Sequence, residues 1–546
     1  MIASTSWLKD AVIYQIYPQS FQDSNQDGVG DFQGIIQRLD YIRDLGINTI
    51  WLNPCFDSPF GDAGYDVRDF YKIAPRYGKE SDFVALLAAA HARGIRVILD
   101  LVAGHTSMDN PWFVEEASHP QSPEANRYIW KNRAFDPQQG PVKDDFVSNF
   151  FWYQPALNFG YSEPSEPWQD PIDAPGPMKN RAELRKILAY WFDLGCDGFR
   201  VDMAGSLVKP ENTPASIEAT KGIWQEIRAW MDVDYPDRVL MSEWSYPSRA
   251  IAAGFHLDFM LHFNAPGYSS LFFNGNGTLP PPAGQTHCYF DAAGKGSLEV
   301  FRQSYMEQRA ATAGKGLITL PVGCHDFQRL RCAPRGWEEL RCAWVFFMTQ
   351  AGPPTIYYGE EIGMRYVEGV AAKEGSTLDG IVAINAGTSG LGERAGTRTP
   401  MQWDASKNAG FSSAEAEALY LPIDEDANRP TVAAQEADQE SLLHFVRKLI
   451  RIRRAHPCLG TDSSFTILNP RETPYPLVIL RASEQARCIV VMNPSSESQS
   501  IELAIDGQVE AVLLNQGCDW TQEQAGVSLT VSKFGYGIFN LNTFPG

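Results

Sequence analysis

The chain has 546 residues, of which 44% are hydrophobic and 21% charged, a globular composition that excludes a disordered, collagen-like or coiled-coil protein. It carries 46 Lys and Arg against 66 Asp and Glu, a net charge of −20. This balance argues against nucleic acid or an anionic membrane as a partner, because little basic surface remains to neutralise phosphates. A neutral or cationic small molecule is the expected ligand.

The chain also lacks the usual targeting patterns. It does not begin with a basic segment followed by an apolar run, and it has no stretch of about 18 apolar residues, so we expect a soluble, cytoplasmic monomer or homodimer. Its nine cysteines lie singly in apolar sequence without a CxxC pair. We therefore predict reduced core cysteines and neither a disulfide framework nor a zinc site.

Short β-branched or aromatic runs alternate with helical patterns, which is typical of βα units on a parallel sheet. The spacing of Ile35, Leu39 and Ile42 predicts one intervening helix, and residues 81–92 predict the next. A doubly wound sheet fits this alternation too, but the strand count and the lack of a glycine-rich phosphate loop favour a closed (β/α)8 TIM barrel in the α/β class. The predicted strands are residues 12–17, 48–52, 96–102, 198–202, 239–243, 257–263, 317–322 and 355–358.

Three long segments interrupt the barrel pattern, and each follows a predicted strand, on the face where barrel active sites lie. We expect them to act as lids or substrate walls, although surface decoration is the alternative. After a predicted helix over residues 440–455 the chain changes to alternating strands, which predict a C-terminal antiparallel β-sandwich domain. The predicted parts are the barrel (1–103 and 180–455), an inserted lid domain B after the third strand (104–179), further inserts (266–296 and 366–397) and the β-domain (456–546).

Acidic side chains gather at the ends of the predicted barrel strands. Asp202, Glu243 and Asp326 each follow a run that should be buried, and Arg200 and His325 stand beside two of them. A single such acid is readily explained as a cap or an ion-pair partner. Three on one barrel face indicate a catalytic site.

The chemistry that suits this set is glycosidic cleavage. In a retaining reaction one carboxylate attacks the anomeric carbon while a second, kept protonated, donates to the leaving oxygen, with the two about 5 to 5.5 Å apart. Arg200 would hold Asp202 ionised through charge-assisted hydrogen bonds, and the neighbouring Trp244 would help to raise the pKa of Glu243. Asp326 would then stabilise an oxocarbenium-like transition state.

Several motifs in order make the chain similar to glycoside hydrolase family 13, the α-amylase family, and most similar to its oligo-1,6-glucosidase and α-glucosidase branch. The resemblance runs from the first strand to the C-terminal β-domain. It rests on GINTIWLNP, GYD at residues 64–66, DLVAGH, GFRVD, MSEW, GCHD, GPPTIYYGEEIGM and RTPMQWD.

This resemblance implies Asp202 as nucleophile, Glu243 as acid/base and Asp326 as transition-state stabiliser. It also implies a set of residues that hold the terminal sugar of a neutral oligosaccharide substrate, with Arg394 as the alternative to the last of them. These substrate-binding residues are Asp62, Tyr65, His105, Arg200, His325 and Arg398.

A separate pattern occurs over residues 23–31, where oxygen-bearing side chains alternate and a glycine follows the third of them. This is the spacing with which an EF-hand-like loop wraps Ca²⁺, and the alternative is a set of Asx turns. The resembling branch carries Ca²⁺ in this loop, which implies a structural Ca²⁺, or Mg²⁺ in its place. The implied ligands are Asp23, Asn25, Asp27, the Val29 carbonyl and Asp31.

Departures from the family pattern leave linkage preference open. Gly104 replaces an Asn, Ala156 replaces an acid, Met203 and Ala204 follow the nucleophile, and Ala395 follows Arg394. The leading hypothesis is a retaining, exo-acting α-glucosidase on short maltose- or isomaltose-type substrates. The alternatives are an α-glucosyltransferase or sugar isomerase on sucrose- or trehalose-type substrates, and a non-catalytic binding relative, which would typically lack one of the acids.

Overall fold

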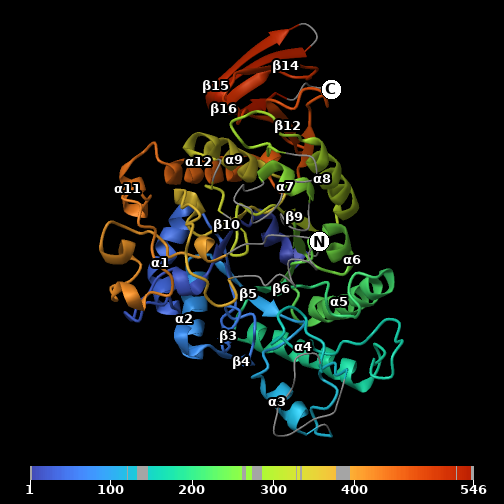
Figure 1. Cartoon of the computed structure of the whole chain (residues 1–546). Helices are drawn as coiled ribbons and strands as arrows, with labels where there is room; N and C mark the ends of the chain where they lie inside the picture. Colours follow the sequence, from blue (N-terminus) through green and yellow to red (C-terminus); the bar gives the residue numbers. More distant parts are fainter. Residues whose placement is uncertain are drawn as a thin grey trace.

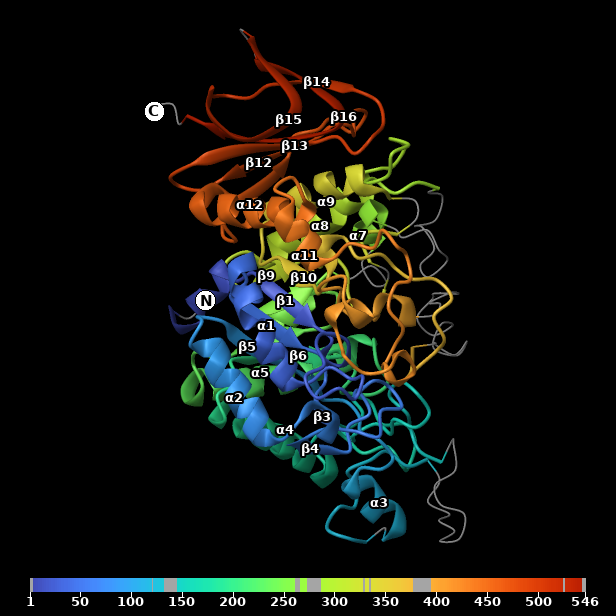
Figure 2. The ribbon, with the colours of Figure 1, turned by 90° about the vertical axis from the view of Figure 1, so that its left-hand side faces the viewer.

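The chain folds around one eight-stranded parallel sheet, with the segment that contains α3 (Pro111–Ser118) at one end of the molecule and an antiparallel sheet at the other (Figure 1). Figure 2 shows the same order of parts after a 90° turn. The computed structural model describes residues 3–119, 121–131, 145–260, 266–272, 286–327, 329–332, 335–376, 394–523 and 526–542.

The parallel strands form the predicted barrel. They are paired in the order β10-β1-β2-β5-β6-β7-β8-β9, and a bridge between Pro321 and Thr355 joins the two ends of this series. Every strand residue is buried except the half-buried Arg96, as expected for strands covered by helices outside and by side chains inside. The strands are β1 (Ile13–Ile16), β2 (Thr49–Leu52), β5 (Arg96–Val102), β6 (Gly198–Asp202), β7 (Val239–Ser242), β8 (Leu257–Phe259), β9 (Leu317–Thr319) and β10 (Thr355–Tyr357).

Helices cover the barrel, and α1 shows how the sequence sets their limits. Asp31 caps its first turn by accepting from the Gly34 N–H, and Gly46 ends it in the left-handed conformation at φ 100°. The predicted helix over 81–92 is α2, shifted by one residue. The helices are α1 (Phe32–Leu45), α2 (Glu80–His91), α4 (Pro175–Asp193), α5 (Pro214–Asp234), α6 (Pro247–Ala252), α7 (Pro266–Phe272), α8 (Glu299–Thr312) and α9 (Trp337–Thr349).

The long segment after β5 contains α3 and short antiparallel bridges, and it returns to the barrel at α4. An antiparallel bridge joins His105, at its start, to Ala156. Helix α4 begins at Pro175, earlier than the predicted start near Asn180, because proline suits the first helical position. Parts of all three predicted inserts, residues 132–144, 273–285 and 377–393, lie outside the described residues.

Short elements complete this part of the chain. A two-stranded antiparallel sheet, β3 (Phe56–Asp57) and β4 (Asp69–Ile73), carries the loop with Asp62 between its strands. The 3-10 helices are η1 (Ala3–Asp10), η2 (Pro18–Ser20), η3 (Pro75–Tyr77), η4 (Glu360–Ile362), η5 (Ala395–Thr397), η6 (Lys407–Gly410), η7 (Ala416–Ala418) and η8 (Pro457–Leu459).

The C-terminal region confirms the predicted antiparallel β-domain. Along β13 and β16, Val490 and Ile538 join the buried cluster of the barrel helices, whereas Ile489, Val491 and Leu529 join a separate cluster within the sheet. This alternation places one layer against the barrel and one inside the domain. The elements are α11 (Val432–Ala437), α12 (Leu442–Ala455), β11 (Ser464–Ile467), β12 (Leu477–Ala482), β13 (Arg487–Met492), β14 (Gln499–Leu503), β15 (Val509–Glu523) and β16 (Gly526–Leu541).

Two cysteines differ from the prediction. Cys458 and Cys488 form a disulfide, so the expectation of nine reduced cysteines is wrong for this pair. The two residues lie 30 positions apart in the sequence, and only the fold brings them together. The other seven are buried thiols.

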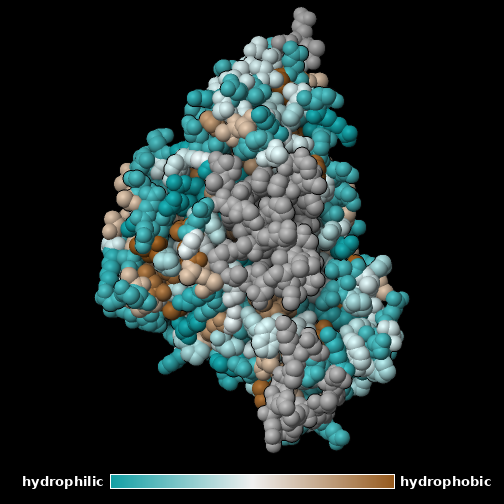
Figure 3. All heavy atoms as spheres, in the orientation of Figure 1, coloured by the Kyte–Doolittle hydropathy of each residue, from teal (hydrophilic) through white to brown (hydrophobic). Residues whose placement is uncertain are grey.

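The outer surface fits the composition. Figure 3 shows mainly hydrophilic residues over the described surface of one face, in keeping with the net charge of −20. Among the described residues, none of the helices combines the length and apolar character needed to cross a membrane.

Candidate active site

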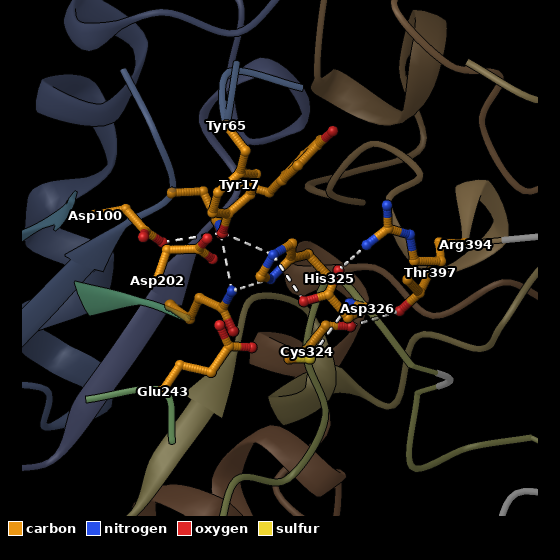
Figure 4. Close-up of polar contacts among 12 residues, drawn as sticks. Tyr17, Tyr65, Asp100, Asp202, Glu243, Cys324, His325, Asp326, Arg394 and Thr397 are labelled. Carbon is orange, nitrogen blue, oxygen red and sulfur yellow. Dashed lines mark hydrogen bonds and ion pairs between the residues drawn. The ribbon is translucent and has the colours of Figure 1, made fainter. Parts of the chain in front are cut away.

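The predicted acids meet at the carboxyl ends of the barrel strands. Asp202 is the last residue of β6, Glu243 follows β7, and Asp326 lies in the turn after β9 (Figure 4). Their side chains keep exposed fractions of 11%, 12% and 17%. They therefore border the solvent that a substrate would displace, while the groups beneath them are sealed.

Arg200 lies beneath these acids and binds two of them together with Asp100. Its Nη1 is 2.8 Å from Asp202 Oδ1 and 2.9 Å from Asp100 Oδ1, and its Nη2 is 2.9 Å from Glu243 Oε2. Its side chain is only 2% exposed. Burial alone would lower the pKa of the guanidinium, but the surrounding carboxylates raise it well above its usual value. One cation thus fixes the two acids side by side.

The surroundings of Asp202 and Glu243 raise the pKa values of both acids. Burial raises the pKa of Glu243 to about 8, with Arg200 opposing the shift and the charge of Asp202 adding to it. Burial also raises the pKa of Asp202, to about 7, against the effect of Arg200. Burial thus favours the protonated form of both acids and Arg200 the ionised form of both, and a retaining reaction needs one of each: an ionised nucleophile and a protonated general acid.

Asp326 stays ionised for a different reason. Burial would raise its pKa, but His325, Arg394 and Arg398 together hold the pKa well below its usual range. The carboxylate contacts Arg394, and it lies 3.4 Å from Arg398 Nη2 and 3.1 Å from His325 Nε2. A fixed negative charge at this position suits the stabilisation of a developing cation.

Tyr65 and His325 form a stacked pair next to the acids. Their rings lie 5.5 Å apart and 7° from parallel, and the Tyr65 hydroxyl is 2.8 Å from His325 Nε2. The same hydroxyl donates to Asp100 at 3.0 Å, and Gln15 Nε2 lies 2.9 Å from His325 Nδ1. The imidazole is held from both nitrogens, so its ring orientation is set before a substrate arrives.

Asp62 marks the other side of the site. It accepts from Gln154 Nε2 at 2.8 Å and lies 3.5 Å from Arg394 Nη2. Burial raises its pKa to about 7, and Arg394 opposes that shift. Arg394 thus bridges Asp62 and Asp326, whereas Arg398 donates through Nε to the His325 carbonyl at 2.8 Å. Of the two arginines weighed from the sequence, Arg394 is the one placed against Asp62.

His105 lies apart from this network. Its Nδ1 is 3.1 Å from Asn149 Nδ2, in the segment inserted after β5, and among the described residues its buried Nε2 has no hydrogen-bond partner. Burial lowers the pKa of His105 to about 3, so it is neutral. The Asn149 amide can only donate, so Nδ1 accepts and Nε2 carries the ring hydrogen, which interacts with the Tyr65 backbone.

In the loop over residues 23–31, aspartate side chains accept hydrogen bonds from the loop's own backbone. Asp23 accepts from the N–H groups of Asn25, Gln26 and Gly28, and Asp27 accepts from Val29 N–H. Cys324, His325 and Asp326 form the group of three candidate ligands whose ligand atoms lie within 4.8 Å of one another among the described residues. The aspartate oxygens of the loop do not come this close together. The loop shows the Asx turns of the alternative reading, and Ca²⁺ binding stays a prediction.

Two polar residues of the site were not singled out in the sequence. Gln15 and Asn53, at the ends of β1 and β2, form a hydrogen-bonded chain to Tyr65. Their signal was a polar residue at the end of an apolar strand, the same signal that marked Asp202. Gln154 carried no such signal because it lies in an irregular loop.

Comparison with known proteins fits this arrangement. The model of the α-amylase catalytic domain matches residues 15–462, which include the end of β1, the other seven barrel strands and the acidic cluster. The chain belongs to the α-amylase family.

The similar proteins within the family carry the names of different enzymes. The chain is 31% identical over 550 residues to a trehalose synthase/amylase, TreS, of Mycolicibacterium smegmatis, covering 91% of this chain and 86% of the relative. It is 28% identical to an oligo-1,6-glucosidase of Parageobacillus thermoglucosidasius, covering 91% and 92%. Among solved structures, a mutant isomaltulose synthase of Erwinia rhapontici NX5 in complex with its natural substrate sucrose matches with a TM-score of 0.80 at 25% identity, covering 98% and 99%.

Proposed function

We propose that the protein moves a terminal α-glucosyl unit from one hydroxyl of a sugar acceptor to another, as a disaccharide isomerase with transglucosylase character. The supporting observation is the pair of comparisons with synthases, one by sequence and one by structure, each covering at least 91% of this chain. The second candidate is hydrolysis, which uses the same first step. The similarity to an oligo-1,6-glucosidase supports it.

The proposed reaction has two displacements. In the first, an Asp202 carboxylate oxygen attacks the anomeric carbon, the glycosidic C–O bond breaks, and Glu243 gives its proton to the leaving oxygen. In the second, Glu243 takes the proton of the acceptor hydroxyl, whose oxygen attacks the same carbon and frees Asp202. The raised pKa of Glu243, about 8, supports its role as the acid. Asp326 stabilises the positive charge that develops on the sugar.

The remaining side chains hold the glucosyl unit. Asp62 and Arg394 face its terminal hydroxyls, Tyr65 offers a ring face to its C–H surface, and His105 donates one hydrogen bond through Nε2. The Asp62–Arg394 pair, 3.5 Å apart, supports an exo-acting site because it sets charged groups against the hydroxyls of a terminal sugar.

Product analysis tests this proposal. Purified protein is incubated with maltose, isomaltose, sucrose or trehalose as sole substrate, and products are separated by chromatography over time. We expect at least one disaccharide to yield an isomeric disaccharide faster than it yields free glucose. Radiolabelled glucose is then added to the reaction. The label stays in free glucose if the glucosyl unit is transferred within one bound sugar pair, and it enters the product if the unit is transferred to an acceptor from solution.

The control is Asp202→Ala, which removes the attacking carboxylate and should abolish turnover. A wild-type protein that releases glucose from every substrate, with no new disaccharide, would establish a glucosidase and contradict the proposed isomerisation. Sustained turnover by the Asp202→Ala variant would contradict the mechanism itself.

A further inference from the structure

A short turn after η4, formed by residues 373–376 and called here the end-wall turn, closes on itself and is held to the site. The Ser376 N–H donates to the Lys373 carbonyl at 3.1 Å, and the Lys373 N–H donates to the Ser376 hydroxyl at 2.8 Å. The Arg394 N–H in turn donates to the Ser376 carbonyl at 2.8 Å. The turn is therefore attached to the same arginine whose side chain bridges Asp62 and Asp326.

Gly375 brings the backbone of this turn directly against Asp62. A Cβ built on Gly375 would lie 2.5 Å from Asp62 Oδ1 and 3.0 Å from Asp62 Cα, and the residue has φ of +66°. Its carbonyl accepts from Arg394 Nη2 at 2.6 Å. Only glycine allows this approach without displacing the carboxylate, since any side chain would be both strained and in collision. The turn thus backs the Asp62–Arg394 pair.

Glu374 anchors the turn from the other side. Arg76 donates to its two carboxylate oxygens at 3.0 and 3.1 Å, and the Tyr420 hydroxyl donates to it at 3.0 Å. The carboxylate side chain is 13% exposed, and the Arg76 guanidinium stacks 3.3 Å from the centre of the Phe60 ring. A bidentate, mostly buried pair of this kind holds direction as well as position. Glu374 itself adopts φ of +47°, a strained conformation that needs such support.

The anchor also reaches the acids through two tyrosines. Tyr420 shares a hydrogen bond with Tyr17 at 2.9 Å between their hydroxyl oxygens, and Arg398 Nη1 lies 3.5 Å from the Tyr17 hydroxyl. Three segments distant in sequence, around Arg76, the end-wall turn and Tyr420, are thus drawn together behind Asp62.

We propose that the end-wall turn limits the glucosyl site to a single terminal sugar, and that Glu374 is the positioning residue that holds Gly375 against Asp62. This inference rests on the proposed function, since it names what decides donor length at that same site. Donors whose terminal sugar carries a further unit or a blocking group would collide with the turn.

Two variants test the inference in opposite ways. Glu374→Ala releases the anchor, so binding of a single-sugar probe weakens while donors with a blocked non-reducing end become acceptable. Gly375→Ala drives a methyl group toward Asp62, so the probe binds more weakly and blocked donors stay excluded. Glu415→Ala, which removes a glutamate from an exposed pair with Lys407, is the matched control.

The binding probe is 1-deoxynojirimycin, measured by calorimetry, which needs no turnover and so separates this inference from the proposed function. Losing the charged contacts of Glu374 predicts a roughly tenfold or greater rise in Kd, and Glu415→Ala should leave Kd within about twofold. Arg76→Ala should reproduce the Glu374→Ala effect, and the double variant should add little to either, because both break one pair.

Turnover gives the second readout. The substrates are 4-nitrophenyl α-glucoside and an end-blocked 4-nitrophenyl maltooligosaccharide, with melting curves to confirm folding. We expect the ratio of kcat/KM for blocked over unblocked donors to rise about tenfold or more in Glu374→Ala and not in Gly375→Ala. Equal probe affinity in wild type, Glu374→Ala and Gly375→Ala would overturn the inference, as would a donor ratio that does not change in Glu374→Ala. A wild type that binds the probe yet forms no new disaccharide would refute the isomerase and leave the wall supported.

Discussion

Replacing Arg200 with lysine tests how one cation organises the site. The guanidinium reaches Asp100, Asp202 and Glu243 at 2.8 to 2.9 Å through two nitrogens, whereas a single ammonium cannot meet all three carboxylates at once. If two of the three charged hydrogen bonds are lost, at about 1.5 to 3 kcal/mol each, transition-state stabilisation falls by about 3 to 6 kcal/mol. That predicts a fall in kcat/KM of about 10² to 10⁴.

The pH dependence gives this prediction a second, more specific consequence. Arg200 opposes the burial that raises the pKa of Asp202, so Arg200→Lys should raise that pKa further and move the acidic limb of the kcat/KM profile to higher pH. The assay is 4-nitrophenyl α-glucoside turnover across the pH range, with circular dichroism melting to confirm the fold. A folded variant with kcat/KM within about threefold of wild type and an unmoved acidic limb would refute the reasoning.

Other predictions concern the acids and the loop. The kcat/KM profile of the wild type should be a bell whose acidic limb, set by Asp202, and alkaline limb, set by Glu243, both lie at higher pH than free carboxyl groups would give, because burial raises both pKa values; a flat profile would contradict both assignments. Asp258 accepts from the Trp244 N–H at 3.1 Å, so Asp258→Asn should misplace the neighbouring Glu243 and lower kcat about tenfold with KM little changed, measured on the same substrate. Calcium at about 100 times its Kd should stabilise the wild type by about 2.7 kcal/mol over protein in EGTA. This gain, measured by calorimetry, should be absent in Asp23→Asn, and its absence from the wild type would remove the predicted metal.

The barrel strands were predictable because a buried parallel strand is almost wholly apolar and is flanked by helical patterns. Residues 96–102 and 198–202 were predicted with the bounds that the structure shows, whereas the predicted strand over 317–322 ends at Thr319. Such ends depend on whether a neighbouring strand offers hydrogen bonds, which no local pattern records. The disulfide between Cys458 and Cys488 was missed for the same reason, since their proximity arises only from packing.

In the candidate site, too, some residues could be predicted from the sequence and others only from the structure. Asp202, Glu243 and Asp326 stand at strand ends, where local sequence marks them, and the fold gathers them because all parallel strands of a barrel end on one face. The sequence favoured Arg398 for this role with Arg394 as the alternative, whereas the structure puts Arg394 against Asp62.

What the sequence determined by itself was the barrel, the antiparallel C-terminal domain and the acids that border the site, because periodicity and residue type at strand ends are local properties. Only the tertiary structure decided how these groups are coupled: that one buried guanidinium serves three carboxylates, and that the turn carrying Glu374 and Gly375 closes on Asp62. The physical reason is that pKa values, ion pairs and close backbone contacts depend on distances between residues that lie hundreds of positions apart in the chain, as Arg76 and Glu374 do at a separation of 298.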